Sequence, residues 1–487
     1  MSENLYASLQ EFIRNHCIMK VEQIYTSCLA QGAYYIESNG EAAIIDPLRD
    51  IEPYLQKAAG NNATIKYVLE THFHADFVSG HIDLTKVTGA TLVFGPNAQP
   101  SYPAHIAKDG EELKVGKLTL KVLHTPGHTL ESTTYLLQDE NGKDLALFTG
   151  DTLFIGDVGR PDLAAKSDLS QADLAGMLFE SLRTKIMPLA DDVVIYPAHG
   201  AGSACGKNMS KETSDTLGNQ KKTNYALRAD MTKAEFIAEV TNGLLPPPEY
   251  FPVNVQLNKQ GYINIDTVLA KGLQPLTVAA FQNEINSANA LVLDTRKPQD
   301  FAAGFIPKSI NIGIDGGFAP WVGTLLPDVH QPIILVADAG REQEVITRMA
   351  RVGFDNILGF LEGGIAAWTA AGNKTETITS IAADAFAKTY AEDDTIAVID
   401  VRKPGEFAPD HIVNARNLPL DYIQQQLEQF PKGETLYIHC AGGYRSMIAA
   451  SILKHKGFTD LVEIQGGYAS IKNTTIPRHI AATEVSA

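Results

Sequence analysis

The sequence has few cysteines and no long apolar run. Its 487 residues include four cysteines, Cys17, Cys28, Cys205 and Cys440. They are far apart and form no Cys-x-x-Cys pair, so they favour a reducing compartment over a disulfide framework. No uncharged apolar stretch reaches the roughly 18 residues of a membrane span, and Glu3, Glu11 and Arg14 interrupt the start where a signal peptide is apolar. These absences predict a cytoplasmic protein.

Positive charge is also scarce. The chain has 40 Lys and Arg against 57 Asp and Glu, a formal net charge of −17. Such a chain has no general attraction for nucleic acid or for an anionic membrane, so local positive groups must hold any anionic substrate. The simplest role of the charge is solubility. The length predicts about three domains.

The first half of the chain consists of short apolar stretches that end in polar turns. Four such stretches, residues 67–70, 118–123, 145–149 and 193–196, each run into a turn with His or Asp. Functional groups of α/β proteins commonly lie on loops at strand ends. The stretch from Leu245 to Pro248 contains three prolines and cannot continue a helix. We therefore expect the first domain to end near residue 265.

The second half of the chain contains an internal repeat. Asp294-Thr295-Arg296 matches Asp400-Val401-Arg402, and Glu362-Gly363-Gly364 matches Gln465-Gly466-Gly467. Each copy alternates β-rich runs with helical patterns, which predicts a parallel sheet with helices on both faces. The period is too long for a solenoid and indicates a duplicated domain.

The polar turns of the first half carry a set of possible metal ligands. They are His72, His74, Asp76, His128, Asp151 and His199. Imidazole and carboxylate together suit zinc or non-haem iron, and no cysteine competes in these motifs. A single histidine in such a place is usually a core or surface residue, but six such groups at strand ends indicate a metal centre.

These motifs resemble the metallo-β-lactamase superfamily, in its glyoxalase II branch, over roughly residues 18–260. Phe77 stands where the dinuclear hydrolases of that family have a metal-binding His, and Phe cannot ligate a metal. The persulfide dioxygenase subgroup is similar in this respect and binds one iron through two His and one Asp. The resemblance implies one Fe(II) per chain, held by His72, His128 and Asp151. His74, Asp76 and His199 would then orient the ligands and water.

Two further residues are candidates for substrate binding in this domain. Arg160, in Gly159-Arg160-Pro161-Asp162-Leu163, matches an arginine motif of the subgroup and could hold a substrate carboxylate. The alternative is a structural pair with Asp162. Cys205 follows His199 in a Gly-rich loop and could reach the substrate entrance, with Lys207 lowering its pKa. The alternative is a small buried cysteine that packs under the loop.

The two repeats resemble rhodanese domains. The strongest motif is the segment from His439 to Ser446, HCAGGYRS, which follows an apolar strand and precedes a helical run. Backbone N–H groups of such a loop form a positive cradle that stabilises a thiolate or persulfide. Cys440 is the predicted nucleophile, and Arg445 is predicted to hold an anionic sulfur oxide. Gly442, Gly443 and Tyr444 complete the predicted substrate loop.

The first repeat lacks this chemistry. Counting back from Gly353 places Val336 at the nucleophile position, with Asp338 adding a repulsive charge nearby. We therefore expect this repeat to keep the rhodanese fold without its activity.

The predicted architecture is a multidomain α/β protein, an αββα metallo-β-lactamase sandwich followed by two parallel-sheet rhodanese domains. The expected parts are an extension at 1–17, a dioxygenase domain at 18–265, a degenerate rhodanese at 270–375 and an active one at 380–487. The resemblances imply oxidation of a low-molecular-weight thiol persulfide with O₂ to sulfite and thiol, and sulfur transfer giving thiosulfate. They also imply a homo-oligomer, dimer or tetramer, and the acidic composition predicts no nucleic-acid or membrane partner. The alternatives are a zinc thioester hydrolase of the glyoxalase II kind and a sulfur-carrier scaffold with a relic metal domain.

Overall fold

The computed structural model describes residues 19–163 and 169–481, which form two compact units. The first comprises residues 19–265 with 350–353, and the second comprises 266–349 with 354–481. The expected extension at residues 1–17, with Cys17, lies outside the described residues. In the described part of the chain, no helix is long and apolar enough to cross a membrane.

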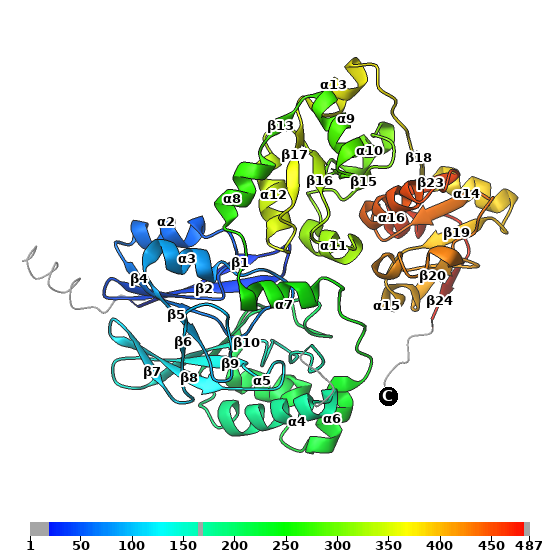
Figure 1. Cartoon of the computed structure of the whole chain (residues 1–487). Helices are drawn as coiled ribbons and strands as arrows, with labels where there is room; N and C mark the ends of the chain where they lie inside the picture. The colour runs from blue at the N-terminus through cyan, green and yellow to red at the C-terminus, as the bar shows by residue number, and fades with distance from the viewer. Residues whose placement is uncertain (1–18, 164–168, 482–487) are drawn as a thin grey trace, which may run out of the picture. The chain divides into compact units, whose positions relative to one another are not determined.

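The first unit contains two six-stranded sheets (Figure 1). One has the order β1 (Met19–Thr26), β2 (Gln31–Ser38), β3 (Glu41–Ile45), β4 (Thr64–Leu69), β5 (Thr91–Phe94) and β6 (His105–Ile106). The other has the order β12 (Asp215–Thr216), β11 (Val194–Pro197), β10 (Asp144–Gly150), β9 (Thr133–Gln138), β8 (Leu118–His124) and β7 (Glu112–Val115). The predicted strands before the polar turns are thus present.

Helices cover the outer faces of both sheets, which confirms the predicted αββα sandwich. They are α2 (Glu52–Gly60) and α3 (His81–Thr88) on the first sheet, and α4 (Gln171–Ser181), α5 (Leu217–Thr223) and α6 (Lys233–Thr241) on the second. The core between the sheets includes Tyr34 and Phe148, whose ring centroids lie 5.0 Å apart. The Tyr34 hydroxyl donates to the carbonyl of Pro197 at 2.6 Å, which ties β2 to the end of β11 beneath the His199 turn.

Helix α7 (Phe251–Gln260) follows the proline-rich stretch and holds the His-rich turn. The buried amide of Asn258 donates to the carbonyls of His74 and Phe77, at 2.8 Å each. A segment far along the chain therefore fixes the turn that carries the metal ligands.

The second unit contains two five-stranded parallel sheets, as the repeat predicts. Their orders are β13 (Pro275–Leu276), β17 (Ile357–Leu361), β16 (Ile333–Val336), β14 (Leu291–Asp294), β15 (Ile310–Asn311), and β18 (Thr379–Ala382), β23 (Leu461–Gln465), β22 (Leu436–His439), β19 (Ala397–Asp400), β21 (Arg416–Asn417). A separate short antiparallel pair joins β20 (Asp410–Ile412), which lies between β19 and β21 in the chain, to β24 (Arg478–Ile480), which follows β23.

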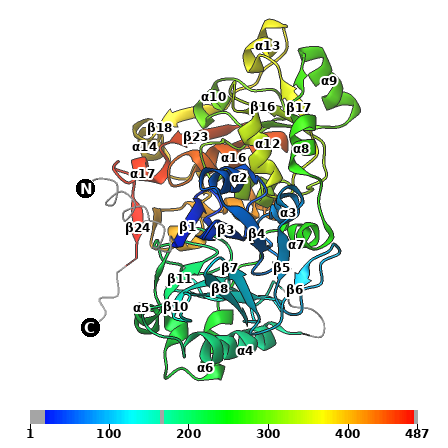
Figure 2. The same cartoon turned by 90° about the vertical axis from the view of Figure 1, so that its left-hand side faces the viewer.

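Helices accompany the strands in both copies, seen in green to yellow and in orange to red in Figures 1 and 2. They are α8 (Ile265–Gly272), α9 (Val278–Ser287), α10 (Pro298–Ala303), α11 (Phe318–Leu325), α12 (Glu342–Ala350), α13 (Gly364–Ala370), α14 (Ala383–Glu392), α15 (Pro404–Phe407), α16 (Tyr444–His455) and α17 (Gly467–Ile471).

The repeated Asp-x-Arg motif is a structural staple. Arg402 forms a two-pronged ion pair with the buried Asp400, at 2.6 and 2.9 Å, and the Asn417 amide donates to the carbonyls of both residues. Arg296, Asp294 and Asn311 repeat this arrangement in the first copy.

Candidate metal centre and sulfur-transfer loop

Three predicted metal ligands meet at the ends of three strands. His72 follows β4, His128 follows β8 and Asp151 follows β10. Their ligand atoms all lie within 4.8 Å of one another. Asp151 Oδ2 is 3.9 Å from His72 Nε2 and 3.4 Å from His128 Nε2. The structure therefore brings together the two imidazoles and one carboxylate that the sequence singled out.

Neighbouring groups aim both imidazoles at Asp151. His72 Nδ1 lies 3.0 Å from Thr71 Oγ1, and His128 Nδ1 lies 2.8 Å from the Arg160 carbonyl. Each contact leaves Nε2 free to face the carboxylate, which is how outer groups orient histidine ligands. Burial lowers the pKa of His72 well below its ordinary value, which favours the neutral imidazole that binds metals.

Several polar atoms of the site have no hydrogen-bond partner, which is consistent with a divalent metal binding there. Within the described residues, both carboxylate oxygens of the buried Asp151 lack a hydrogen-bond partner, as do both ring nitrogens of His199. Buried polar atoms without partners are costly and need an explanation. A cation bound here would satisfy them, and two imidazoles with one carboxylate suit iron or zinc.

The second predicted trio surrounds this centre. His199 Nε2 lies 3.5 Å from Asp151 Oδ1 and 3.5 Å from Asp76 Oδ2, so it links the two carboxylates. His74 Nε2 instead lies 3.2 Å from Asp46 Oδ1 and 3.6 Å from Glu70 Oε2. Burial alone would lower the pKa of His74, but these carboxylates raise it to about 9.

Phe77 is fully buried beside this trio. Its ring centroid is 4.3 Å from that of His74 and 6.5 Å from that of His199. The ring centroid of Phe154 lies 6.2 Å from that of His199. An apolar ring, which cannot ligate a metal, thus lies beside two of the three possible ligands of this trio.

The Cys440 loop has the predicted strand, loop and helix arrangement between β22 and α16. The Gly443 N–H donates to Cys440 Sγ at 3.1 Å, and Gly443 has a φ of +102°, which favours glycine. The backbone N–H of Tyr468 donates to the Cys440 carbonyl at 2.6 Å. A methyl carbon added at Gly467 would lie 2.4 Å from that carbonyl oxygen. Close backbone packing therefore shapes the loop around the sulfur.

Comparisons with known proteins identify the families of both units. A family model described as the metallo-beta-lactamase superfamily matches residues 28–199, and the rhodanese-like domain model matches residues 277–371 and 383–474. A crystal structure of a metallo-beta-lactamase from Staphylococcus aureus subsp. aureus COL is 32% identical, with a TM-score of 0.63. The match covers 70% of this chain and 98% of that one. The chain is a metallo-β-lactamase–rhodanese fusion.

Curated relatives of the fusion match its first unit. The mitochondrial persulfide dioxygenase ETHE1 of Homo sapiens is 30% identical, over 45% of this chain and 78% of its own length. The hydroxyacylglutathione hydrolase GloC of Haemophilus influenzae is also 30% identical, over 39% of this chain and 94% of its own length. The chain thus has the domains of an enzyme, and its relatives include both an oxygenase and a hydrolase.

The side chain of Arg160 is hydrogen-bonded to other groups of the fusion. Its guanidinium forms two bonds of 2.6 Å with Asp162 and donates to the carbonyls of Leu245, at 2.6 Å, and Ala204, at 3.2 Å. Four donor contacts on a nearly buried side chain favour the structural alternative over a free fork for substrate.

Cys205 lies at the metal centre instead of at an entrance. It is buried, and its sulfur lies within 4.8 Å of ligand atoms of Asp151 and His199. Burial raises the pKa of its thiol, as do Asp76 and Asp151. The expectation that Lys207 lowers this pKa is wrong, because its ammonium donates to the carbonyls of Glu239 and Asn242. A cysteine therefore does stand among the possible ligands.

Sequence reasoning missed three residues around the metal centre. Asp46 and Glu70 are buried beside His74, and Asp46 also accepts bonds from the backbone and side chain of Thr71. Tyr250 is buried, and Asp76 and Cys205 are close enough to raise its pKa. Asp46 and Glu70 end strands like the predicted residues, so strand-end position could have found them. Nothing in the local sequence marks Tyr250.

Arg445 and Tyr444 both have partners in the second unit. Arg445 forms a two-pronged ion pair with Glu406, at 2.6 and 2.7 Å. The Tyr444 hydroxyl donates to the carbonyl of Gly313, in the first repeat, at 2.7 Å. Tyr444 is therefore fixed by the degenerate copy, while Arg445 stays beside the loop.

The degenerate loop has a different register from the one expected. Val336 pairs with Asp294 just as His439 pairs with Asp400, so Val336 is the last strand residue. Ala337 therefore corresponds to Cys440, and the assignment of Val336 to the nucleophile position is wrong. The count failed because the segments between the loop and Gly353 or Gly457 differ in length. Further on, Gly340, with a φ of +83°, corresponds to Gly443.

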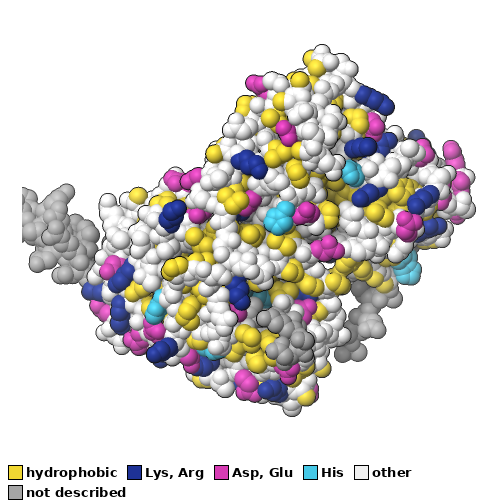
Figure 3. All heavy atoms as spheres, viewed as in Figure 1, with side chains coloured by type: hydrophobic (Ala, Val, Ile, Leu, Met, Phe, Trp, Pro, Cys, Tyr) yellow, Lys and Arg dark blue, Asp and Glu magenta, His cyan; other side chains and the backbone are white. Residues whose placement is uncertain are grey.

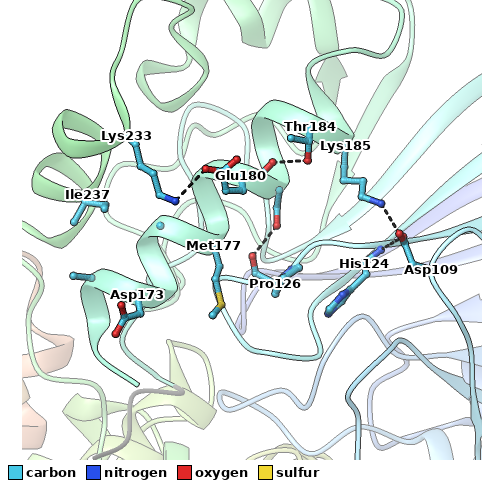
Figure 4. A pocket seen from close by; sticks show the side chains of 13 residues that line it. Asp109, His124, Pro126, Asp173, Met177, Glu180, Thr184, Lys185, Lys233 and Ile237 are labelled. Carbon is cyan, nitrogen blue, oxygen red and sulfur yellow. Dashed lines mark hydrogen bonds and ion pairs between the residues drawn. The ribbon is translucent and has the colours of Figure 1, made fainter. Parts of the chain in front are cut away.

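A surface pocket over α4 is separate from both sites (Figure 4). Its polar side chains largely pair with one another: Lys185 with Asp109 at 2.5 Å, and Lys233 with Glu180 at 3.0 Å. His124, at its edge, contacts the Leu130 carbonyl at 2.9 Å. On the face in Figure 3, Lys and Arg side chains are scattered among acidic ones, as the composition predicts.

Proposed function

We propose that the fusion oxidises a low-molecular-weight thiol persulfide to sulfite and thiol in its first unit, and that its Cys440 loop transfers sulfane sulfur to give thiosulfate. The observation that carries the first activity is the buried set of His72, His128 and Asp151 beside Phe77. This set offers three ligands for one metal. His74, Asp76 and His199 form a second group of possible ligands, but the raised pKa of His74 favours the protonated imidazole, which cannot bind a metal. Similarity to a persulfide dioxygenase supports the same assignment.

The residues of the first unit have three roles in this proposal: they bind the metal, orient its ligands and exclude water. His72, His128 and Asp151 would hold one Fe(II), which supplies oxygen activation when bound. Thr71 and the Arg160 carbonyl keep the two imidazoles in position. Phe77, with the other buried rings around His199, excludes water from the centre.

The residues of the Cys440 loop bind and transfer sulfur. The Gly443 N–H stabilises negative charge on Sγ. Arg445 lies next to the loop and supplies the cation for an anionic sulfur oxide. The thiolate attacks the sulfane sulfur of a persulfide, forming an S–S bond while the departing thiol keeps the electron pair. Sulfite then takes the outer sulfur, which leaves as thiosulfate and regenerates the thiolate.

A zinc thioester hydrolase is the second candidate, because a hydroxyacylglutathione hydrolase is equally similar over the first unit. Metal content with oxygen uptake on a thiol persulfide separates the two. We expect about one iron per chain and oxygen uptake that an iron chelator abolishes. Two tightly bound zinc ions with thioester hydrolysis would contradict the dioxygenase.

Replacement of Cys440 tests the division between the two sites. In Cys440→Ser, we expect thiosulfate formation to disappear and sulfite to accumulate, while oxygen uptake stays near the wild-type rate. Product analysis by chromatography and an oxygen electrode measure both on one sample. A matching fall in oxygen uptake would show that the two activities are not separate.

A further inference from the structure

A chain of hydrogen bonds leads from Cys440 into the protein interior. The Cys440 thiol donates to Ser446 Oγ at 3.6 Å, and the Ser446 hydroxyl donates to Glu463 Oε1 at 2.9 Å. Ser380 donates to the other oxygen, Glu463 Oε2, at 2.6 Å. Cys440, Ser446 and Glu463 are all buried, and they come from the loop, helix α16 and strand β23.

Glu463 is an unexpected residue for a central strand. Its side chain is buried and makes no ion pair with a cation in the described part of the chain. The nearest cation of the loop, Arg445, is paired with Glu406. Burying a carboxylate costs free energy, and acidic side chains are seldom buried without a paired cation. Burial raises its pKa, while bonds from Ser380 and Ser446 oppose that rise.

The degenerate repeat provides an internal comparison. Strand pairing sets Phe360 against Leu335 and Pro275, as it sets Glu463 against Ile438 and Ser380. Counting along the loop from Ala337, which corresponds to Cys440, places Gln343 where the active copy has Ser446. The copy without the thiol therefore lacks all the other members as well. The fold itself does not need a carboxyl at this place.

We propose that Glu463, acting through Ser446, accepts the proton of the Cys440 thiol. This inference rests on the proposed sulfur transfer at Cys440. The thiol proton moves to Ser446 Oγ while the hydroxyl proton of Ser446 moves to Glu463 Oε1. The S–H electron pair stays on sulfur, so the step is a proton transfer without oxidation or reduction.

The relay makes a nucleophile without adding net charge to the loop. Before the transfer, Cys440 and Glu463 together hold one negative charge, on the Glu463 carboxylate. After the transfer they still hold one negative charge, on Cys440 Sγ. Ser446 can then reverse its hydrogen bond and donate to the thiolate, which the Gly443 N–H already stabilises. Glu463 touches no substrate in this scheme and is a positioning residue.

The test is the pH dependence of alkylation at Cys440 in the full chain, followed for that peptide by mass spectrometry with iodoacetamide. Two groups that share one proton titrate in two steps. We expect two steps in the wild type and one in Glu463→Gln, which cannot accept the proton. Glu362→Gln, an exposed glutamate in the degenerate repeat, is the matched control and should keep two steps.

A second variant, Ser380→Ala, tests the relay if Glu463→Gln does not fold. Ser380→Ala removes only the bond to Glu463 Oε2, so the step that belongs to Glu463 should move to higher pH. Identical single-step profiles in wild type, Glu463→Gln and Ser380→Ala would overturn the relay.

Sulfur transfer from thiosulfate to cyanide separates the relay from the proposed function. We expect kcat in Glu463→Gln to fall by about 100-fold, the lower range for positioned proton transfer. A wild-type chain without any transfer activity would contradict the proposed function alone, because alkylation does not depend on it. Unchanged kcat in Glu463→Gln would count against the relay.

Discussion

At the scale of single residues, we propose that Phe77 limits the first unit to one metal. It is the one position in the His-rich segment where an apolar ring replaces a possible ligand, and it lies next to both His74 and His199. The third possible ligand beside Asp76 and His199 is His74, whose raised pKa favours the protonated form that cannot bind a metal. A neutral imidazole in place of Phe77 would complete the second site.

Phe77→His should therefore create a second metal site. We expect the zinc content of protein loaded with excess zinc to rise from about one to about two per chain, because the new imidazole joins Asp76 and His199. Elemental analysis after gel filtration measures it. Phe73→His is the control, since Phe73 packs on Phe94 at 4.8 Å, in the core between the first sheet and its helices. A second zinc in the control and not in Phe77→His would contradict this account.

At the scale of elements, the two rhodanese loops share a backbone arrangement and differ in the side chains that would carry sulfur transfer. Both loops follow a buried strand and contain a glycine with positive φ at the same place. The differences are in side chains: Ala337 for Cys440 and, by the same register, Glu342 for Arg445. Asp338 adds another carboxylate where an anion would have to bind.

Ala337→Cys in a Cys440→Ser background should not restore sulfur transfer. The new thiol would face Asp338 and Glu342, which oppose a thiolate and repel thiosulfate. The thiosulfate–cyanide assay measures the outcome, and the wild-type chain sets its scale. Val336→Cys should be equally inactive, because Val336 is a fully buried strand residue. Robust transfer by Ala337→Cys would show that the loop needs only a thiol.

At the scale of the second unit, the degenerate copy contacts the active loop. A methyl carbon added at Gly316 would lie 2.3 Å from Tyr444 Cζ, so the ring packs directly on the glycine backbone. The backbone N–H of Asn311 donates to Ser451 Oγ, on helix α16, at 3.0 Å. We therefore propose that the first repeat has an architectural role, because it contacts α16 at both Tyr444 and Ser451.

Gly316→Ala should disturb sulfur transfer from a distance. The added methyl group would displace Tyr444. Such overpacking lowers the free energy of unfolding by about 1–3 kcal/mol. We expect a lower melting temperature and slower thiosulfate-dependent transfer, with oxygen uptake unchanged. Gly317→Ala is the matched control, because its methyl group would meet Trp321 at an ordinary 3.5 Å. Equal effects of the two substitutions would mean that the Tyr444 contact is unimportant.

The sequence alone was sufficient for the fold class and for residues that the structure brings together at the two candidate sites. Strand-end histidines and the HCAGGYRS segment are local patterns, because metal ligation and thiolate stabilisation require particular side chains beside particular turns. The duplication was visible for the same reason: Asp400 and Arg402 form a local ion pair that both copies need. These features depend on residues close together in the chain.

Tertiary structure decided what depends on register and on packing between distant segments. Strand pairing moved the nucleophile position of the degenerate copy from Val336 to Ala337, because a strand's partner cannot be counted across segments of unequal length. In the folded chain, Arg160 bonds to Asp162 and to the Leu245 carbonyl, and Cys205 lies beside Asp151. The link from Cys440 to Glu463 exists only because parallel strands and α16 meet beneath the loop.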